Sequence, residues 1–349
     1  MRHTLPLLAS LLLVACGDNT TSNPTGDAAT TDTATGTDAS MMGDTAMGTD
    51  ATQGDASMTG DASMMGDTAM GTDARTDAST MARCGTARPS LASTGSTEGL
   101  VIAADGTLYY SQPGGVGRMT ADGMRNNTWV RITGASTVWG LALDRTRQRL
   151  YVGSPSTHNV HQLDLSSDPP QVTDFATMGG GPNGLTIDGE GNVYFSDFSG
   201  GHVYRVTPDG TKTRVTGTTI PQANGLAFRA DGVLLVDSYQ RGSVIGLTLA
   251  DGMETGRMTV VSGGLGNPDG LALDAMGNIY VTDNSGGRLI RLSPTGSNPE
   301  VLMMGLRAPA NIEFGAGDLN CNDVYVATGS GLQRFQDNPS AGADVPWHH

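Results

Sequence analysis

Short runs of apolar residues alternate with turn residues throughout residues 84–349. Runs such as 193–195 (VYF) and 279–281 (IYV) are rich in β-branched and aromatic side chains, and Gly, Asp, Asn and Pro separate them. Asp-Gly pairs, for example Asp105-Gly106 and Asp231-Gly232, supply the positive φ angles that tight hairpin turns require. The runs do not follow the 3.6-residue period of an amphipathic helix. The pattern predicts an all-β domain of short antiparallel strands.

The strand pattern also repeats about every 43 residues, a spacing typical of β-propeller blades. Each full copy begins with one residue followed by Gly-Leu, and a sixth copy is degenerate. The six starting residues are Glu98, Trp139, Asn183, Asn224, Asp269 and Asn311. We therefore predict a six-bladed β-propeller of four-stranded blades. The last copy shows only three strands, near 310–315, 323–327 and 331–335, so we expect residues 84–98 to add the fourth strand and close the ring.

In a propeller these six starting residues should form a ring at one mouth of the central channel. Five of the six carry an amide or carboxylate oxygen, and hard divalent cations, Ca²⁺ above all, prefer such ligands. Two carboxylates, Glu98 and Asp269, would offset the charge of one ion. The alternative is that the Asn-Gly and Asp-Gly pairs are ordinary turn residues. We expect Asp197, Asp237 and Asp283, at the ends of the second strands, to serve turns or support the site rather than bind metal directly.

The N-terminal 83 residues differ in kind from the rest. Residues 1–15 combine a basic head with a short apolar core, which indicates a secretory signal peptide. Residues 13–16 (LVAC) resemble a bacterial lipobox, which implies lipidation of Cys16; a plain signal peptide with an incidental Cys is the alternative. Residues 16–83 are rich in Thr, Asp, Ala, Gly and Met, and the segment 38–51 recurs unchanged at 61–74. We expect this tract to be a disordered tether.

The net charge of −15 changes meaning once the tether is set apart. Residues 1–83 hold 11 of the 35 acidic side chains and three of the 20 basic ones, which leaves 24 acidic and 17 basic residues in 84–345 and the few residues after it. This balance argues against nucleic-acid binding, which needs clustered basic residues. Three Cys are too few for a disulfide scaffold. Cys84 and Cys321 both fall in the closing blade, where they form either a disulfide or two separate thiols.

The segments 268–296 (PDGLALDAMGNIYVTDNSGGRLIRLSPTG) and 308–328 (APANIEFGAGDLNCNDVYVAT) resemble the gluconolactonase/regucalcin (senescence marker protein) family. The similarity extends over about residues 90–335. The resemblance implies a six-bladed propeller that holds one divalent cation. By position it implies Glu98, Asn224 and Asp269 as metal ligands and Asn183 as a contact to metal or substrate. One departure is Gly181, where the sugar-lactone enzymes of the family have an Arg that helps to bind substrate.

These observations favour a metal-dependent hydrolase of a lactone or ester, in which Asp269 acts as general base. Asn183 and Asn311 would contact substrate, and Trp139 would pack over it or simply fill the channel. The alternative is a non-catalytic surface propeller that binds a ligand or protein, since fold does not determine function; a streptogramin-lyase-like activity is a further one. We expect a monomer with a small-molecule substrate, no nucleic-acid partner, and membrane contact only through the lipid anchor. The expected location is the bacterial cell envelope, at the outer membrane.

Overall fold

The computed structural model describes residues 84–177 and 179–343, which form 23 strands in six antiparallel sheets. The first three sheets consist of β1 (Leu100–Ile102), β2 (Leu108–Gln112), β3 (Gly115–Met119) and β4 (Arg125–Arg131); β5 (Leu141–Asp144), β6 (Arg149–Ser154), β7 (Asn159–Asp164) and β8 (Gln171–Thr177); and β9 (Pro182–Ile187), β10 (Val193–Asp197), β11 (His202–Val206) and β12 (Lys212–Arg214). The last three consist of β13 (Ala223–Phe228), β14 (Leu234–Ser238), β15 (Ser243–Ala250) and β16 (Met253–Val261); β17 (Pro268–Leu273), β18 (Ile279–Asp283), β19 (Arg288–Leu292) and β20 (Glu300–Met303); and β21 (Pro309–Phe314), β22 (Val324–Thr328) and β23 (Gln333–Phe335).

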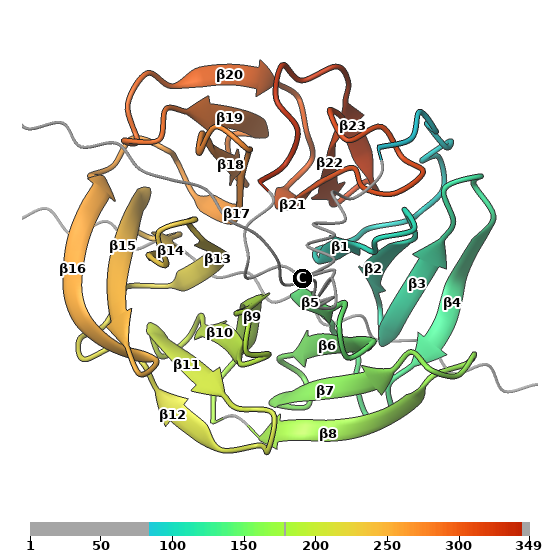
Figure 1. The fold of residues 1–349 in the computed structure, drawn as a ribbon, viewed down its shortest axis with the longest axis horizontal. Coiled ribbons are helices and arrows are strands. Elements are labelled where there is room, and N and C mark those ends of the chain that lie inside the picture. The colour runs from blue at the N-terminus through green and yellow to red at the C-terminus, as the bar shows by residue number, and fades with distance from the viewer. Residues whose placement is uncertain (1–83, 178, 344–349) are drawn as a thin grey trace, which may run out of the picture. The chain divides into compact units, whose positions relative to one another are not determined.

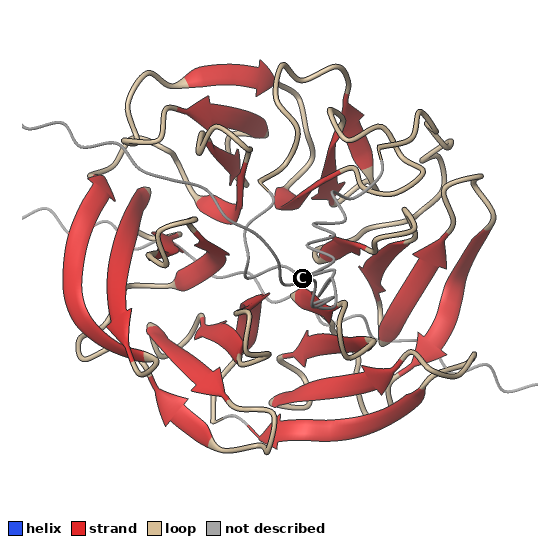
Figure 2. Ribbon diagram, viewed as in Figure 1, coloured by secondary structure: helices blue, strands red, loops and turns tan. Residues whose placement is uncertain are grey.

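The six sheets follow one another around a central axis in chain order, as Figure 1 shows, with β1, β5, β9, β13, β17 and β21 innermost. The predicted six-bladed β-propeller is therefore confirmed. Strands and loops make up the described residues (Figure 2). Within residues 84–177 and 179–343 there is no helix long and apolar enough to cross a membrane.

Tight turns connect the strands as the Asp-Gly pairs predict. At the β1–β2 turn Gly106 has a φ of 87°, its N–H donates to Ala103 O, and the Asp105 side chain accepts the N–H of Thr107 at 2.8 Å. Glycine adopts this left-handed conformation without the steric cost of a Cβ atom. Each such turn directs the second strand of a blade back along the first.

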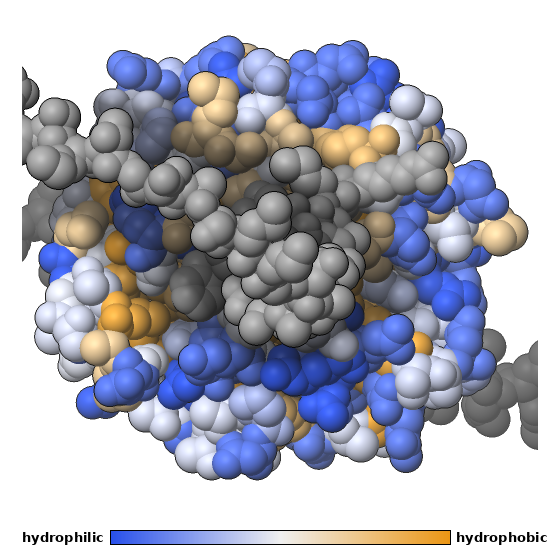
Figure 3. Space-filling model, viewed as in Figure 1, coloured by the Kyte–Doolittle hydropathy of each residue, from blue (hydrophilic) through white to orange (hydrophobic). Residues whose placement is uncertain are grey.

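The core lies between neighbouring sheets, because each sheet presents an apolar face to the next. Tyr151 of the second sheet packs with Leu185 and Phe195 of the third. Tyr280 meets Phe314 across the fifth and sixth sheets, with ring centroids 5.0 Å apart. Burial of each such large side chain stabilises the fold by about 1.5–3 kcal/mol. The exposed face in Figure 3 is mostly hydrophilic, with scattered apolar groups; the large exposed ones include Met124, Met276 and Met304.

The closing blade differs from the prediction in one detail, because its sheet has only the three strands β21–β23. Residues 84–98 do not add a fourth strand. They form a single β-bridge, between Ala87 and Leu319, and lie between β23 and β4. On the β23 side Pro89 O accepts a hydrogen bond from Arg334 Nη1, and on the β4 side Ala92 O accepts one from Arg125 Nη1. The segment joins the two ends of the ring through loop contacts because its Pro and Ser residues do not continue a β-ladder.

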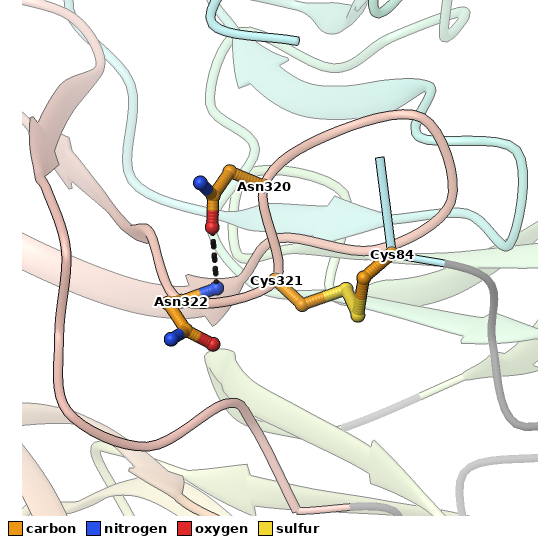
Figure 4. The surroundings of a disulfide bond; sticks show 4 residues. All are labelled: Cys84, Asn320, Cys321 and Asn322. Atoms are coloured by element: carbon orange, nitrogen blue, oxygen red, sulfur yellow. Dashed lines mark hydrogen bonds between the residues drawn. A yellow bond between two sulfur atoms is a disulfide. The ribbon is translucent and has the colours of Figure 1, made fainter. Parts of the chain in front are cut away.

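A disulfide also joins the two ends of the ring. Cys84 and Cys321 are bonded, with Cα atoms 5.4 Å apart and 237 residues apart in sequence (Figure 4). Beside it, Asn320 Oδ1 accepts the N–H of Asn322 at 2.9 Å, which shapes the loop that carries Cys321. Closing so long a loop restricts the unfolded chain and stabilises a protein by about 2–5 kcal/mol.

The signal peptide at 1–15, the tether at 16–83 and the lipidation site Cys16 lie outside the described residues. The described part of the propeller ends at residue 343, two residues before the predicted boundary at 345.

Candidate functional site

Residues at or just before the start of the inner strands line one cavity of about 400 Å³ in the central channel. Glu98, Trp139, Asn183, Asn224 and Asp269 all belong to its wall. They meet because the strands approach closely at the Gly that follows each of them. A Cβ atom on Gly140 would lie 1.8 Å from Asn183 O, and one on Gly225 would lie 2.7 Å from Asp269 O. The Gly-Leu step thus reflects the narrowness of the channel mouth.

The sixth position of the ring is occupied by Ala310 rather than by Asn311. Pro268 pairs with Asp283 and Leu271 with Val281; in the closing blade Pro309 pairs with Thr328 and Ile312 with Val326. Ala310 therefore matches Asp269, and Asn311 takes the place of a ring glycine. The alignment in the sequence was one residue off because the sixth copy lacks the Gly-Leu step.

Asn311 nevertheless lines the same cavity, and its Oδ1 accepts the N–H of Ile312 at 2.6 Å. Its predicted contact with substrate stays a prediction.

Asp269 is held in place from two sides. Its Oδ1 accepts a hydrogen bond from Asn224 Nδ2 at 2.9 Å, and its Oδ2 accepts one from Asn284 Nδ2 at 2.8 Å. Each carboxylate oxygen has two lone pairs, so each keeps one for another partner. Since Asn224 uses its nitrogen for this bond, its own side-chain oxygen is left for a further contact. Only 7% of Asp269 is exposed, so the carboxylate is fixed in a largely dry site.

Burial dominates the electrostatics of the site. It raises the pKa of Asp269 well above its usual range, the nearby charge of Glu98 raises it further, and the amide donors of Asn224 and Asn284 oppose the shift. Burial also raises the pKa of Glu98. Two partly desolvated carboxyl groups that repel each other favour either a bound proton or a bound cation.

A third acid, Asp237, belongs to the same group. In the other blades the equivalent residues are hydroxyl-bearing in three cases: Ser111, Ser196 and Thr282 accept the N–H of Gly99, Gly184 and Gly270, each at 2.9 Å. Asp237 replaces that hydroxyl in β14, is 0% exposed, and neither of its oxygens has a hydrogen-bond partner among the described residues. Burial raises its pKa well above the usual range, the charge of Asp269 adds to the shift, and the N–H of Gly225 opposes it.

Of the three second-strand acids, Asp197 and Asp283 serve turns, as predicted, and the prediction that Asp237 does not bind metal directly stays a prediction. Asp197 accepts the N–H groups of Gly181 and Gly200 at 3.2 and 3.0 Å, and Asp283 accepts those of Asn267 and Gly286 and pairs with Arg288. Both are turn residues. Asp237 lies one register position earlier, where it points to the ring: its Oδ2 lies 2.5 Å from where a Cβ on Gly225 would be.

The residues present fit a divalent cation. Among the described residues there is no set of three His, Cys, Asp or Glu side chains close enough to hold a metal by themselves. The donors at the mouth are instead mixed, with carboxylates of Glu98 and Asp269 and the amide of Asn224, a set that suits Ca²⁺ or Mg²⁺ better than zinc. The unpartnered Asp237 carboxylate beside them adds negative charge that a cation would offset.

A row of three aromatic side chains adjoins the site, and of these the sequence predicted only Trp139. Trp139 meets Phe198 edge-on at 6.2 Å between centroids, and Phe198 meets Tyr239 at 5.6 Å. Phe198, Tyr239 and Asn284 each directly follow a second strand, so the residue after that strand is the signal that could have identified them. Gly181 faces Trp139, whose ring would lie 3.6 Å from a Cβ there, and leaves the space before the indole open.

Comparisons with known proteins agree with this architecture. The sequence pattern of the SMP-30/gluconolactonase/LRE-like region matches residues 73–219 and 200–330. A 6-deoxy-6-sulfogluconolactonase of Pseudomonas putida is 30% identical over 156 residues, which are 43% of this chain and 50% of that enzyme. The chain thus spans about half the length of this curated relative.

Solved structures show the same fold at low sequence identity. A structure assigned as a gluconolactonase superposes with a TM-score of 0.63 at 20% identity, over 74% of this chain and 94% of that chain. A regucalcin from Agrobacterium tumefaciens, described as a calcium-binding protein, superposes with a TM-score of 0.62 at 16% identity, over 76% of this chain and 98% of that one. Together with the match of the family pattern to well over half of the sequence, these findings show that the chain belongs to the SMP-30/gluconolactonase/LRE-like family.

Proposed function

We propose that this protein is an exported hydrolase that opens a lactone or cleaves an ester with one divalent cation, Ca²⁺ by preference, at the mouth of the channel. The observation that carries the proposal is the meeting of Glu98, Asn183, Asn224 and Asp269 around one cavity, with Asp269 oriented by two amide donors. Membership of the gluconolactonase-like family supports the same reaction class.

A cation held by Glu98, Asn224 and Asp269 would polarise the carbonyl oxygen of the substrate. Asp269 then accepts a proton from a water that attacks the carbonyl carbon, and passes it to the leaving alkoxide when the acyl–oxygen bond breaks. Its raised pKa suits this exchange, because a base works best when its pKa lies near the working pH. Asn284 and Asn224 keep the carboxylate aimed, Asn183 positions the substrate, and Trp139 packs against its ring.

The test is hydrolysis of a panel of lactones and esters, followed with a pH indicator, in Ca²⁺ and in chelator. The panel includes gluconolactone and its 6-sulfonated derivative, since the Pseudomonas relative is named for the latter. We expect turnover that needs the ion and falls by about 10²–10⁴-fold in Asp269→Asn, the usual contribution of a general base. Glu300→Gln, an exposed acid on the outer strand β20, is the matched control and should leave turnover unchanged.

A second candidate function is a surface propeller that binds a ligand without turning it over. Gly181, in the place of the Arg expected from the family resemblance, favours it, because a substrate anchor is missing there. Ca²⁺ binding with no turnover across the panel would support this alternative and contradict the hydrolase.

The same proposal includes export and anchoring. The signal peptide at 1–15 and the lipobox-like residues before Cys16 support a lipoprotein of the cell envelope, joined to the propeller by the 16–83 tether. Incorporation of labelled palmitate into the wild-type protein, lost in Cys16→Ala, tests this. Unlabelled wild-type protein that is nevertheless secreted would indicate a plain signal peptide.

A further inference from the structure

At one level of the channel below the ring, one blade has an ionisable side chain where the other five have uncharged ones. Glu313 of β21 pairs with Tyr325, and the residues in the same register of the five other inner strands are Val101, Ala142, Thr186, Ala227 and Ala272. All six line the cavity. Five walls of the channel at this level thus carry no charge, and the sixth carries a carboxyl group.

In the described part of the chain, the carboxyl group of Glu313 has no structural partner that would account for a glutamate at this position. Among the described residues no hydrogen bond or ion pair reaches its carboxyl group, although the side chain is only partly exposed, towards the cavity. Burial raises the pKa of Glu313 to about 7, and the positive charge of Arg145 offsets part of that effect. A buried carboxyl group without partners destabilises the fold, and alanine serves at this position in three blades.

Arg145 also lines the cavity and is near enough to influence Glu313, but it is already engaged. Its Nη2 donates to Ile102 O, in the neighbouring blade, at 2.8 Å. The nearby wall is apolar and includes Leu143, Phe228 and Leu273. The wall of the lower channel is therefore mostly apolar, and the carboxyl group of Glu313 on one side can accept a hydrogen bond.

We propose that Glu313 forms a second subsite in the channel, which takes the amine- or hydroxyl-bearing end of a substrate whose carbonyl group lies at the ring. Ala310 and Glu313 are three residues apart on β21, a separation of at most roughly 10 Å at about 3.3 Å per residue. The irregular register between Pro309 and Ile312 allows both to face the cavity. A substrate with a short apolar chain reaches from one site to the other. This inference rests on the proposed function for the carbonyl end, and names the substrate class: neutral or cationic at its far end, and not anionic.

The charges of the cavity support this selectivity. Among the described residues of its wall, the carboxyl groups of Glu98, Asp269 and Glu313 face one cationic side chain, Arg145, so an ammonium group is attracted and a carboxylate or sulfonate is repelled. The open space at Gly181 points the same way, because no guanidinium stands there to bind an anion.

Three probes that cannot be hydrolysed separate this subsite from catalysis: hexylammonium, 1-hexanol and hexanoate. Their binding to the purified protein saturated with Ca²⁺ is measured by calorimetry. We expect hexylammonium to bind best, hexanol more weakly and hexanoate not at all. Glu313→Gln and Glu313→Ala should weaken hexylammonium binding by about 10- to 100-fold, the range for a hydrogen bond to a charged group. Glu313→Ala restores the residue of three other blades and should fold.

Glu300→Gln, an exposed acid on the outer strand β20, serves as the matched control and should leave hexylammonium binding unchanged. The proposal is overturned if wild-type protein does not bind hexylammonium, if the Glu313 variants bind it as wild type does, if hexanoate binds equally well, or if Glu300→Gln weakens binding as much as the Glu313 variants do. None of these results depends on turnover, so a failed hydrolase proposal and a failed subsite are told apart.

Discussion

Replacing Asp237 with serine separates the electrostatic role of this residue from its place in the fold. In three other blades a hydroxyl group at this position accepts the N–H of the ring glycine at 2.9 Å. The carboxylate of Asp237 is fully buried and neither oxygen makes a hydrogen bond of normal geometry among the described residues, although the N–H of Gly225 lies near enough to lower its pKa. Serine should therefore satisfy the N–H of Gly225 and remove an unfavourable buried acid.

Leaving a buried polar group unsatisfied costs about 1–3 kcal/mol, and more for a charged one. We expect Asp237→Ser to raise the free energy of unfolding of the cation-free protein by about 1–3 kcal/mol or more. For a domain of this size each kcal/mol shifts Tm by about 2–4 °C. In saturating Ca²⁺ the gain should shrink or reverse, because the variant loses a negative charge that favours the ion.

The assay is thermal and urea unfolding at pH 7.5, in chelator and in Ca²⁺. Ser196→Asp is the matched control: it places a carboxylate at the same position of a blade without ring acids, and should destabilise the protein with or without the ion. If Asp237→Ser destabilises the cation-free protein, Asp237 has a structural partner and the reasoning is wrong.

Four further predictions concern the pH dependence of stability, the pH dependence of Ca²⁺ affinity, the disulfide and the orientation of Asp269. Asp269, Asp237 and Glu98 have raised pKa values in the folded state, so their protonated forms stabilise the cation-free fold at low pH. This stabilisation is lost as the pH rises through those pKa values. The free energy of unfolding measured from pH 4 to 8 should therefore fall, and a flat profile would contradict the prediction. Ca²⁺ affinity should rise over the same pH range with release of protons, measurable by calorimetry in two buffers of different ionisation enthalpy. Cys84→Ser with Cys321→Ser should lower the free energy of unfolding by about 2–5 kcal/mol without changing Ca²⁺ affinity, whereas an unchanged midpoint in urea would show that the disulfide is dispensable. Asn284→Leu removes one of the two donors that orient Asp269, and should lower kcat by roughly 10-fold or more with little change in KM. The control is Asn278→Leu, which removes an amide that bonds Asp274 at the other end of the same blade and should leave kcat unchanged.

The repeat could be predicted from the sequence because the channel is narrow. At Gly140 and Gly225 the carbonyl oxygen of the neighbouring inner strand lies so close that a Cβ atom would clash with it, so only glycine fits. The Gly-Leu step therefore marks the inner strands. Five of the six ring residues followed directly. The sixth did not, because Asn311 stands where the other blades have that glycine, and only strand pairing reveals that Ala310 is the equivalent of Asp269.

Register also distinguishes Asp237 from the other second-strand acids. Asp237 looks like Asp197 and Asp283 in sequence, since each ends an apolar run, but pairing through Val236 and Leu226 places it one position earlier, against the ring. A shift of one residue turns a strand side chain to the opposite face. Phe198 and Tyr239 directly follow second strands and join the Trp139 side of the site through ring contacts, whereas Glu313 lines the cavity itself. The sequence repeat did not single out these three residues, because strand pairing is what sets their positions.

The central claim is that the ring acids hold a divalent cation, and a calorimetric titration with Ca²⁺ tests it most directly. Wild-type protein should bind one ion per chain in the micromolar to millimolar range, and Glu98→Gln and Asp269→Asn should each weaken binding by at least about 10-fold, while Glu300→Gln binds as wild type does. Binding that is absent from the wild-type protein, or unchanged in both ring variants, would contradict the account.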